Sequence, residues 1–297
     1  MIKPIYICGP TASGKSALAI ELANQLDGVV VNADAYQLYK GMEILSAAPD
    51  SNELSQAPHQ LYGVLHASEV CNAMRYREMA LPIIEQLISQ GKTPIVTGGS
   101  GMYLKFLTHG PSPVPASDAK LRQELEQEPD QALISRLREL DPEGAAKTNL
   151  QNKRYVIRAL EICILSGQKM SVLKQSWKTE SSKIEAHLKG SYLLWDRETL
   201  RQRINKRTDI MLKTGAIEEV QALPEASITC EKAIGVRQIR SYLSGKIDKC
   251  TCAEQIAAAT RQYAKRQRTW FRKEQWLTPY EIDANVNIKA LAEQVAQ

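Results

Sequence analysis

An eight-residue run near the N-terminus carries the residue types of a phosphate-binding site. It has the pattern Gly-x-x-x-x-Gly-Lys-Ser, formed by Gly9, Pro10, Thr11, Ala12, Ser13, Gly14, Lys15 and Ser16. In such a run the glycines let backbone N–H groups approach an anion, the lysine reaches the terminal phosphates, and the hydroxyl can bind Mg²⁺. The run therefore predicts a bound polyphosphate with Mg²⁺ at Ser16. A nucleotide and a prenyl diphosphate present the same oxygens, so the run alone does not choose between them.

A carboxylate supplies the second candidate for chemistry. Asp34 follows a β-branched run over 28–32, and ligands bind at the carboxyl ends of strands in open α/β sheets. From position alone, three roles are open to Asp34: a Mg²⁺ ligand, a general base, or a residue that only caps the loop.

A cationic segment near the C-terminus supplies the third candidate. Residues 261–273 contain six cations and no acid. Four of the cations fall on one stripe of a helix, at positions Arg261, Lys265, Arg268 and Arg272. Because neighbouring like charges repel without relief, the stripe favours a polyanion partner such as RNA over a merely solvated face.

The segments around these residues indicate alternating strands and helices. We expect strands at 4–8, 28–32, 60–64, 94–97 and 191–195, and helices at 16–26, 72–89, 102–107, 198–222, 233–244 and 252–274. Only helical patterns occur from about 117 to 189, after a connector that contains Pro111, Pro113 and Pro115. We therefore expect an α/β fold: a P-loop NTPase-like parallel-sheet core at 1–115 and 190–297, with an all-helical insertion domain at 116–189.

Composition restricts the class of protein further. The chain has 297 residues, 43% hydrophobic and 24% charged, with a net charge of +5, which is ordinary for a globular enzyme. Its six cysteines lack both zinc spacing and a disulfide framework, so we expect a reducing, cytoplasmic setting. No apolar stretch approaches the length of a membrane span, and the N-terminus does not read as a signal peptide.

Together these motifs resemble those of the tRNA dimethylallyltransferases, also called tRNA isopentenyltransferases, over nearly the whole chain. The resemblance rests on residues 9–16, 32–42, 57–59, 98–104, 158–161, 233–238 and 260–272. The run Tyr39-Lys40-Gly41-Met42, taken with 260–272, is its most specific part. The resemblance implies a channel between core and insertion. Dimethylallyl diphosphate enters one side of the channel, and the anticodon stem-loop of a tRNA enters the other.

The resemblance also implies a reaction and roles for single residues. The dimethylallyl group passes to the exocyclic amine of the adenine 3′ to the anticodon, and diphosphate leaves. Asp34 matches the general base, and Thr11 contacts the leaving diphosphate. Residues 9–16, Mg²⁺ and Arg237 hold that diphosphate. The tRNA contacts implied for this chain are Asp34, Ala35, Tyr36, Gln37, Ser100, Arg122, Arg154, Arg158, Lys265, Arg266, Arg268 and Arg272. We expect a monomer.

Three short runs depart from the family pattern. Asp34-Ala35 stands where Asp-Ser is usual, and Leu45-Ser46-Ala47-Ala48-Pro49 lacks the usual lysine before its proline. Leu150-Gln151-Asn152 replaces Pro-Asn-Asp before the arginines of the insertion. These departures bear on substrate contacts, whereas the residues expected to carry the chemistry are all retained.

Three other functions share part of this pattern. A nucleotide or small-molecule kinase would use the same ATP-binding loop, but the strand at 94–97 ends in Thr97-Gly98-Gly99 rather than in a second acid for Mg²⁺. A prenyltransferase acting on free adenine nucleotides would not need the cations of 261–273. A non-catalytic RNA-binding protein would need neither the intact loop nor Asp34.

Overall fold

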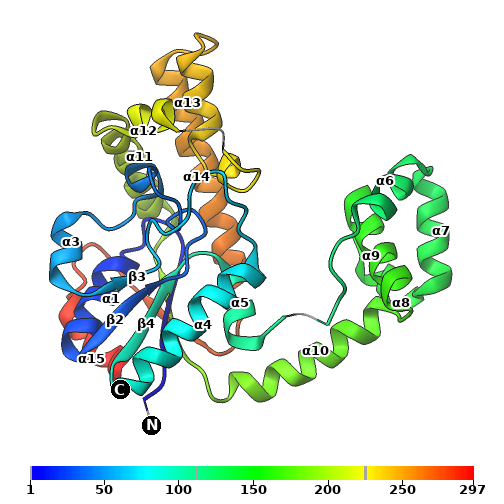
Figure 1. Cartoon of the computed structure of the whole chain (residues 1–297), viewed down its shortest axis with the longest axis horizontal. Helices are drawn as coiled ribbons and strands as arrows, with labels where there is room; N and C mark the ends of the chain where they lie inside the picture. The colour runs from blue at the N-terminus through cyan, green and yellow to red at the C-terminus, as the bar shows by residue number, and fades with distance from the viewer. Residues whose placement is uncertain (1, 112, 224–225) are drawn as a thin grey trace. The chain divides into compact units, whose positions relative to one another are not determined.

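The computed structural model describes residues 2–111, 113–223 and 226–297 (Figure 1). Ser112 of the expected connector lies outside these residues. The backbone divides into two units, which are Met1–Thr108 with Leu188–Gln297, and His109–His187. The second unit begins before the expected residue 116 and ends before the expected residue 189. The second unit is inserted in the sequence of the first.

The first unit is built on one six-stranded sheet in the order β3-β2-β4-β1-β5-β6. The strands are β1 (Ile5–Cys8), β2 (Gly28–Asn32), β3 (His59–Gln60), β4 (Thr93–Gly98), β5 (Lys189–Leu194) and β6 (Leu277–Glu281). Every pairing is parallel, as expected for the α/β core. Cys8 is level with Gly98 on one side and Tyr192 on the other, so the carboxyl ends of three central strands share one edge. Early strands lie on one side of β1 and late strands on the other, and such a switch point favours a binding site there.

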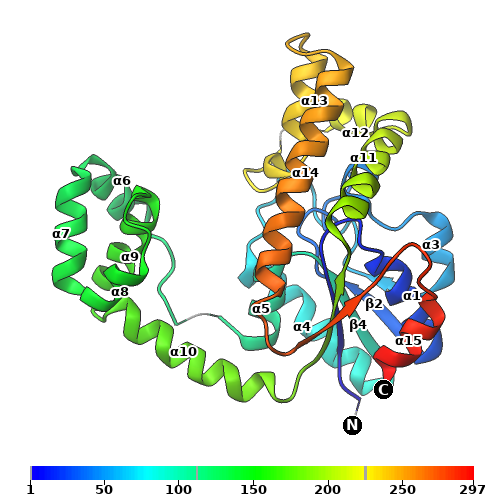
Figure 2. The same cartoon turned by 180° about the vertical axis from the view of Figure 1, so that it is seen from behind.

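Helices cover both faces of the sheet because its strands are apolar on both sides. Ile5 and Ile7 of β1 belong to a core with α1 (Lys15–Gln25) and α15 (Ile288–Ala296). Tyr6 and Cys8 belong to a second core on the opposite face. Helices that contribute to it include α4 (Ala73–Ser89), α5 (Gly101–His109), α12 (Ala216–Ala222), α13 (Val236–Leu243) and α14 (Lys249–Phe271). Seen from behind, α11 (Arg197–Lys213) runs beside α14 (Figure 2). Two short helices, α2 (Glu43–Ser46) and α3 (Ser51–Gln56), and the 3₁₀ turn Cys230–Lys232 lie in the connections.

Two elements differ from their expected form, and two others were not expected. The strand expected at 60–64 is only His59–Gln60, because Leu61 has a φ of 65° and turns the chain. The helix expected at 198–222 is two helices, α11 and α12, since Gly215 has a φ of 121° between them. Strand β6 and helix α15 follow the last expected helix. Pro279 is tolerated in β6 because the strand lies at the edge of the sheet.

In the second unit, the described residues form helices and their connections, with no strand among them. Its helices are α6 (Ala119–Gln127), α7 (Asp130–Leu140), α8 (Pro142–Lys147), α9 (Lys153–Ser166) and α10 (Met170–Glu185). Leu133, Leu137 and Leu160 are fully buried in its core. Glu161 of α9 is also fully buried. Two arginines, a serine hydroxyl and a backbone N–H donate to its carboxylate, and these bonds offset the free-energy cost of burying its charge.

Candidate active site

The phosphate-binding run forms the turn between β1 and α1. Gly14 precedes α1 with a φ of 87°, and Gly9 has a φ of 155°, where a Cβ would lie 2.9 Å from Ser13 Oγ. Helix α1 begins at Lys15, so its unpaired N–H groups and positive end face the turn. Lys15 Nζ donates to the Pro10 carbonyl at 2.8 Å. Burial lowers the pKa of Lys15 to about 8, against the opposing effect of the Asp34 carboxylate.

Side chains from β5 and α11 hold the outside of this turn. Trp195, just after β5, donates its indole N–H to the Ser13 carbonyl at 2.9 Å. Arg203 Nε donates to the Ala12 carbonyl at 2.9 Å, and the Arg203 guanidinium lies 4.4 Å from the centroid of the Trp195 ring. One turn further along α11, Arg207 donates from Nη2 to Thr11 Oγ1. The turn is therefore shaped by contacts with the protein itself.

Asp34 stands directly beyond the carboxyl end of β2. Its N–H donates to Asn32 Oδ1 at 2.8 Å, and its Oδ1 accepts from the N–H of Tyr36 at 3.1 Å. Burial raises the pKa of Asp34, and the Tyr36 N–H, Lys15 and Arg207 oppose that rise. A carboxylate with a raised pKa that is held in place by local backbone bonds is suited to accept a proton.

Two adjoining cavities meet at this carboxylate. They measure about 100 and about 50 Å³, and both are lined by Thr11, Asp34, Ser46 and Arg207. The larger is polar, and its other lining residues come from the phosphate loop, from the end of β4, and from Gln37, Ala47 and Tyr62. The smaller is richer in apolar and aromatic groups, which are Tyr36, Met42, Leu45, Met211, Ile234, Ile256 and Tyr263. Asp34 thus separates a site suited to an anion from one suited to an apolar or aromatic group.

Arg207 is the cation that the structure adds to the sequence-based site. It lines both cavities and contacts Thr11. Burial lowers its pKa, whereas Asp34 favours its charged form. Arg237, to which the resemblance gave the role of diphosphate ligand, is exposed on α13 and does not line either cavity in the described part of the chain. The role of Arg237 stays a prediction. The four-residue spacing of Arg203 and Arg207, which puts both on one helical face, could have pointed to α11.

The polar cavity also has the donors that Mg²⁺ prefers. Ser16 and Asp34 both line it, and their hydroxyl and carboxylate oxygens are hard ligands. Within the residues the structure describes, no group of three or more His, Cys, Asp or Glu side chains could hold a metal. A site with so few protein ligands can still bind Mg²⁺, because this ion commonly keeps several waters and is also bound by the phosphates of the substrate.

The residues expected to contact tRNA fall in separate places. Residues 34–37 lie with Ser100, whose Oγ accepts from the Ala35 N–H at 2.9 Å. In the second unit, Arg122 and Arg158 bind the buried Glu161 at 3.0 and 2.7 Å, and Arg154 is exposed at the start of α9. Asn152, one of the departures from the family pattern, caps α9 through the Arg154 N–H. The tRNA contacts of all these residues stay predictions.

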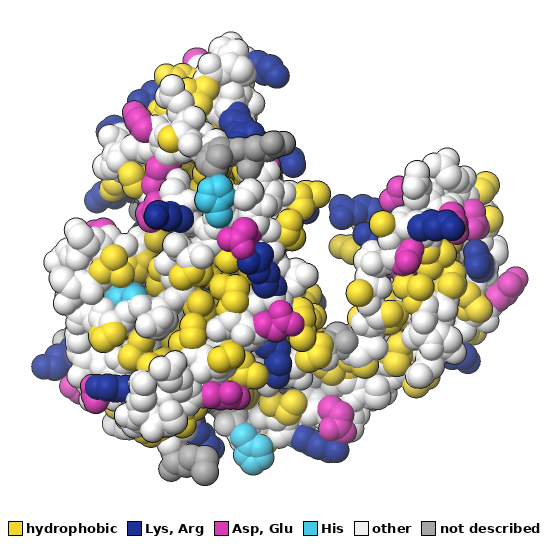
Figure 3. Space-filling view, viewed as in Figure 1, with side chains coloured by type: hydrophobic (Ala, Val, Ile, Leu, Met, Phe, Trp, Pro, Cys, Tyr) yellow, Lys and Arg dark blue, Asp and Glu magenta, His cyan; other side chains and the backbone are white. Residues whose placement is uncertain are grey.

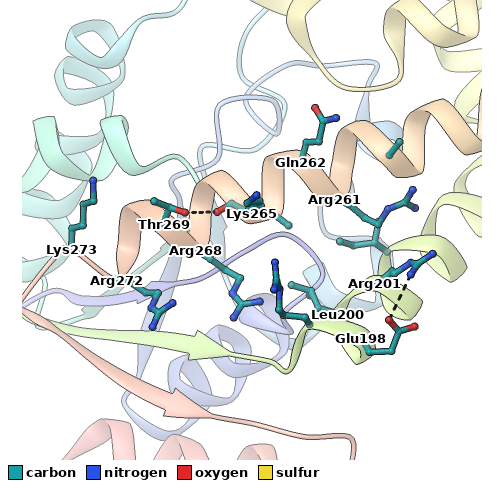
Figure 4. Close-up of a pocket in the computed structure, with 14 residues that line it drawn as sticks. Glu198, Leu200, Arg201, Arg261, Gln262, Lys265, Arg268, Thr269, Arg272 and Lys273 are labelled. Atoms are coloured by element: carbon teal, nitrogen blue, oxygen red, sulfur yellow. Dashed lines mark hydrogen bonds and ion pairs between the residues drawn. The ribbon is translucent and has the colours of Figure 1, made fainter. Parts of the chain in front are cut away.

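The cations of α14 lie on two sides of that helix. Arg261, Lys265, Arg268 and Arg272 line a groove of about 850 Å³ between α14 and the start of α11 (Figure 4). Helix α11 adds Arg197 and Arg201, which the sequence analysis did not single out, and Glu198 is the single acid among the described lining residues. Elsewhere on the first unit, the face in Figure 3 mixes basic and acidic side chains. Arg266 instead lies over Tyr263, 5.6 Å from its ring centroid.

Comparisons with known proteins agree on one family. A family model described as IPP transferase matches residues 37–274. The chain is 42% identical to a tRNA dimethylallyltransferase of Akkermansia muciniphila, covering 99% of this chain and 98% of that protein. It is 38% identical to that of Zymomonas mobilis over 97% and 93% of the two chains.

Solved structures show the same relationship. The tRNA isopentenylpyrophosphate transferase of Bacillus halodurans matches with a TM-score of 0.71 and 30% identity, over 100% of this chain and 96% of that one. A eukaryotic dimethylallyltransferase acting on tRNA matches with a TM-score of 0.78 and 27% identity, over 100% of this chain and 78% of that one. No helix in the described part of the chain is long and apolar enough to cross a membrane. On this evidence the chain belongs to the tRNA dimethylallyltransferases, the IPP transferase family.

Proposed function

We propose that this chain transfers the dimethylallyl group of dimethylallyl diphosphate to the exocyclic amine of the adenine 3′ to the anticodon in tRNA, releasing diphosphate. The observation that carries the proposal is the position of Asp34. Its carboxylate borders both the polar cavity of the phosphate loop and the more apolar cavity beside Tyr263. The nucleophile and the electrophile can therefore meet at one proton acceptor.

The donor binds on the side of the phosphate loop. The N-terminus of α1, Lys15 and Arg207 converge on the polar cavity, where they attract a diphosphate and take up the charge that grows on it as it leaves. Ser16 would hold Mg²⁺ together with the diphosphate oxygens, which leaves the Asp34 carboxylate free to accept a proton. When bound, Mg²⁺ would supply further neutralisation of the leaving group's charge.

The acceptor binds on the side of Tyr36 and Tyr263. An adenine amine is a weak nucleophile, so a carboxylate that accepts its proton as the new C–N bond forms assists the transfer. Asp34 has the required position and a raised pKa. The adenine has to leave the base stack of its RNA loop to enter a pocket. The aromatic rings beside Asp34 offer the adenine a stacking surface.

The basic groove supports a polynucleotide acceptor over a free nucleotide. Seven of its fourteen lining residues are Arg or Lys, more than one mononucleotide could neutralise. Cations in this number suit the repeated phosphates of an RNA backbone. An acceptor tRNA also favours a cytoplasmic setting, and we expect a monomer to act.

One assay tests the proposal. The purified chain is incubated with Mg²⁺ and dimethylallyl diphosphate labelled in its allyl group, and with total tRNA, an isolated anticodon stem-loop or AMP. Label in the adenine 3′ to the anticodon is the expected result. Label in AMP alone would identify a prenyltransferase of free nucleotides. With no transfer to any acceptor, the proposal fails and the kinase and binding-protein alternatives stand.

A further inference from the structure

The side chain of Gln267 joins helix α14 to the phosphate loop. Gln267 is only 4% exposed, although it lies between two arginines in the cationic segment. Its Oε1 accepts a hydrogen bond from the Thr11 N–H at 2.8 Å, and its Nε2 donates to the Gly99 carbonyl at 2.9 Å. Thr11 and Gly99 are 256 and 168 residues away in the sequence. One amide thus connects three segments at the carboxyl edge of the sheet.

The turn after β4 is fitted around this amide. A Cβ on Gly99 would lie 2.1 Å from Gln267 Nε2, and a Cβ on Gly98 would lie 2.2 Å from the Ala33 carbonyl. Neither glycine has a positive φ, so each is required for space rather than for conformation. The two glycines let β4 end close to the segment that carries Asp34 and close to α14.

Through Thr11, Gln267 also influences the position of Arg207. The Thr11 N–H is bound to Gln267, and the Thr11 hydroxyl accepts from Arg207. A displacement of Thr11 would therefore also move the guanidinium that lines both cavities. One turn before Gln267 on α14, Tyr263 lines the cavity at Asp34. The helix with the cations therefore reaches both halves of the site.

We propose that Gln267 is a positioning residue, which holds the phosphate loop in register with the end of β4 and with the cationic helix α14. It does not touch the reacting atoms. It sets where Thr11 and Arg207 meet the diphosphate, so the helix that carries the RNA-binding cations also shapes the diphosphate site. The inference rests on the proposed function in taking the loop as the diphosphate site.

Gln267→Glu tests this role through pH. A protonated glutamic acid can reproduce both hydrogen bonds, since its O–H donates to the Gly99 carbonyl and its C=O accepts from Thr11. The ionised form instead sets a carboxylate oxygen against that carbonyl and adds a negative charge beside the loop. We expect the variant to bind magnesium pyrophosphate about ten- to hundredfold more weakly than wild type near pH ~9 and to recover near pH ~6, because burial raises the pKa of a glutamate. Calorimetric titration measures the dissociation constants of the variant and of wild type at each pH. Their ratio cancels the effect of pH on the protonation of pyrophosphate itself, which is the same for both proteins.

Three further variants give the controls. Gln267→Met keeps the length of the side chain but makes neither hydrogen bond, so its loss of pyrophosphate affinity should be the same at both pH values. Gln255→Glu introduces the same charge at an exposed position of α14 and should bind like wild type. Gly99→Ala places a methyl group against Gln267 Nε2. It should weaken pyrophosphate binding with Gln267 intact, and it carries the test if a Gln267 variant does not fold.

The outcomes separate this inference from the proposed function. If wild type binds pyrophosphate, Lys15→Ala does not, and Gln267→Met and Gly99→Ala bind like wild type, then the loop holds diphosphate but Gln267 does not position it. A loss in Gln267→Glu that is equal at both pH values and accompanies a lower melting temperature would also overturn the role. If wild type binds no pyrophosphate, both the proposed function and this inference fail.

Discussion

The phosphate loop and the basic groove are both rich in cations, but the protein holds their cations differently. At the loop, Lys15, Arg203 and Arg207 each donate to a residue of the loop itself. In the groove, the cations converge from two helices around a single described acid. Preorganised cations lose little freedom when charge develops in a transition state. Cations around an open groove contribute affinity that depends on salt. The comparison predicts that damage at the loop lowers turnover or donor binding, whereas damage in the groove lowers affinity for RNA.

The largest effect should come from the carboxylate between the two cavities. Asp34→Asn keeps the shape of the side chain but cannot accept the proton of the amine. Removal of a positioned base typically slows a reaction by about 10²–10⁴. We expect such a loss in single-turnover rate at saturating substrates, with tRNA affinity almost unchanged. A single-turnover rate close to that of wild type would mean that Asp34 is not the base.

Arg207 and Arg237 provide a direct comparison within the loop region. Arg207→Gln removes the guanidinium shared by both cavities, and we expect pyrophosphate affinity to fall by about ten- to hundredfold. Arg237→Gln changes an exposed residue of α13 and should have less effect on this affinity. Calorimetric titration of magnesium pyrophosphate into each variant measures the difference. A greater loss in Arg237→Gln than in Arg207→Gln would restore the assignment made from the resemblance.

The pKa of Lys15 predicts how donor binding depends on pH. The charged amine attracts diphosphate, and burial lowers the pKa of Lys15 to about 8. The charged form is thus lost as pH rises through about 8, and pyrophosphate affinity should fall by up to about tenfold per pH unit above it. Lys15→Met has no amine to titrate, so the ratio of its dissociation constant to that of wild type should approach a constant at high pH. A ratio that does not change between pH ~7 and ~9 would contradict the role of this amine.

The sequence predicted those parts of the site that depend on short-range pattern. The phosphate loop follows from its motif and Asp34, two residues after β2, from strand position; residues 11–16 and Asp34 line the polar cavity. Gln267 depends on how distant segments pack, which no local pattern records. For Arg207, the spacing with Arg203 indicated a shared helical face but not the loop that this face contacts. The same limit applies to β3, where a positive φ at Leu61 ended a strand that its apolar residues favoured. It also applies to the edge strand β6, where Pro279 weakened the strand signal.

The smallest effect should come from the groove, where no single cation is expected to be essential. Lys265→Gln with Arg268→Gln should weaken tRNA binding and flatten the dependence of log affinity on log salt by at most about two units, because each lost phosphate contact removes about 0.7–0.9. Turnover should recover at saturating tRNA, since neither residue lines the cavities at Asp34. Lys246→Gln with Lys249→Gln removes the same charge from two exposed positions, one just before α14 and one at its first residue, and should leave the slope nearly unchanged. The competing explanation is that the stems of Lys265 and Arg268 pack on the protein. In that case the double variant melts at a lower temperature and keeps the slope of wild type, so melting temperature and salt titration on one preparation decide between the two.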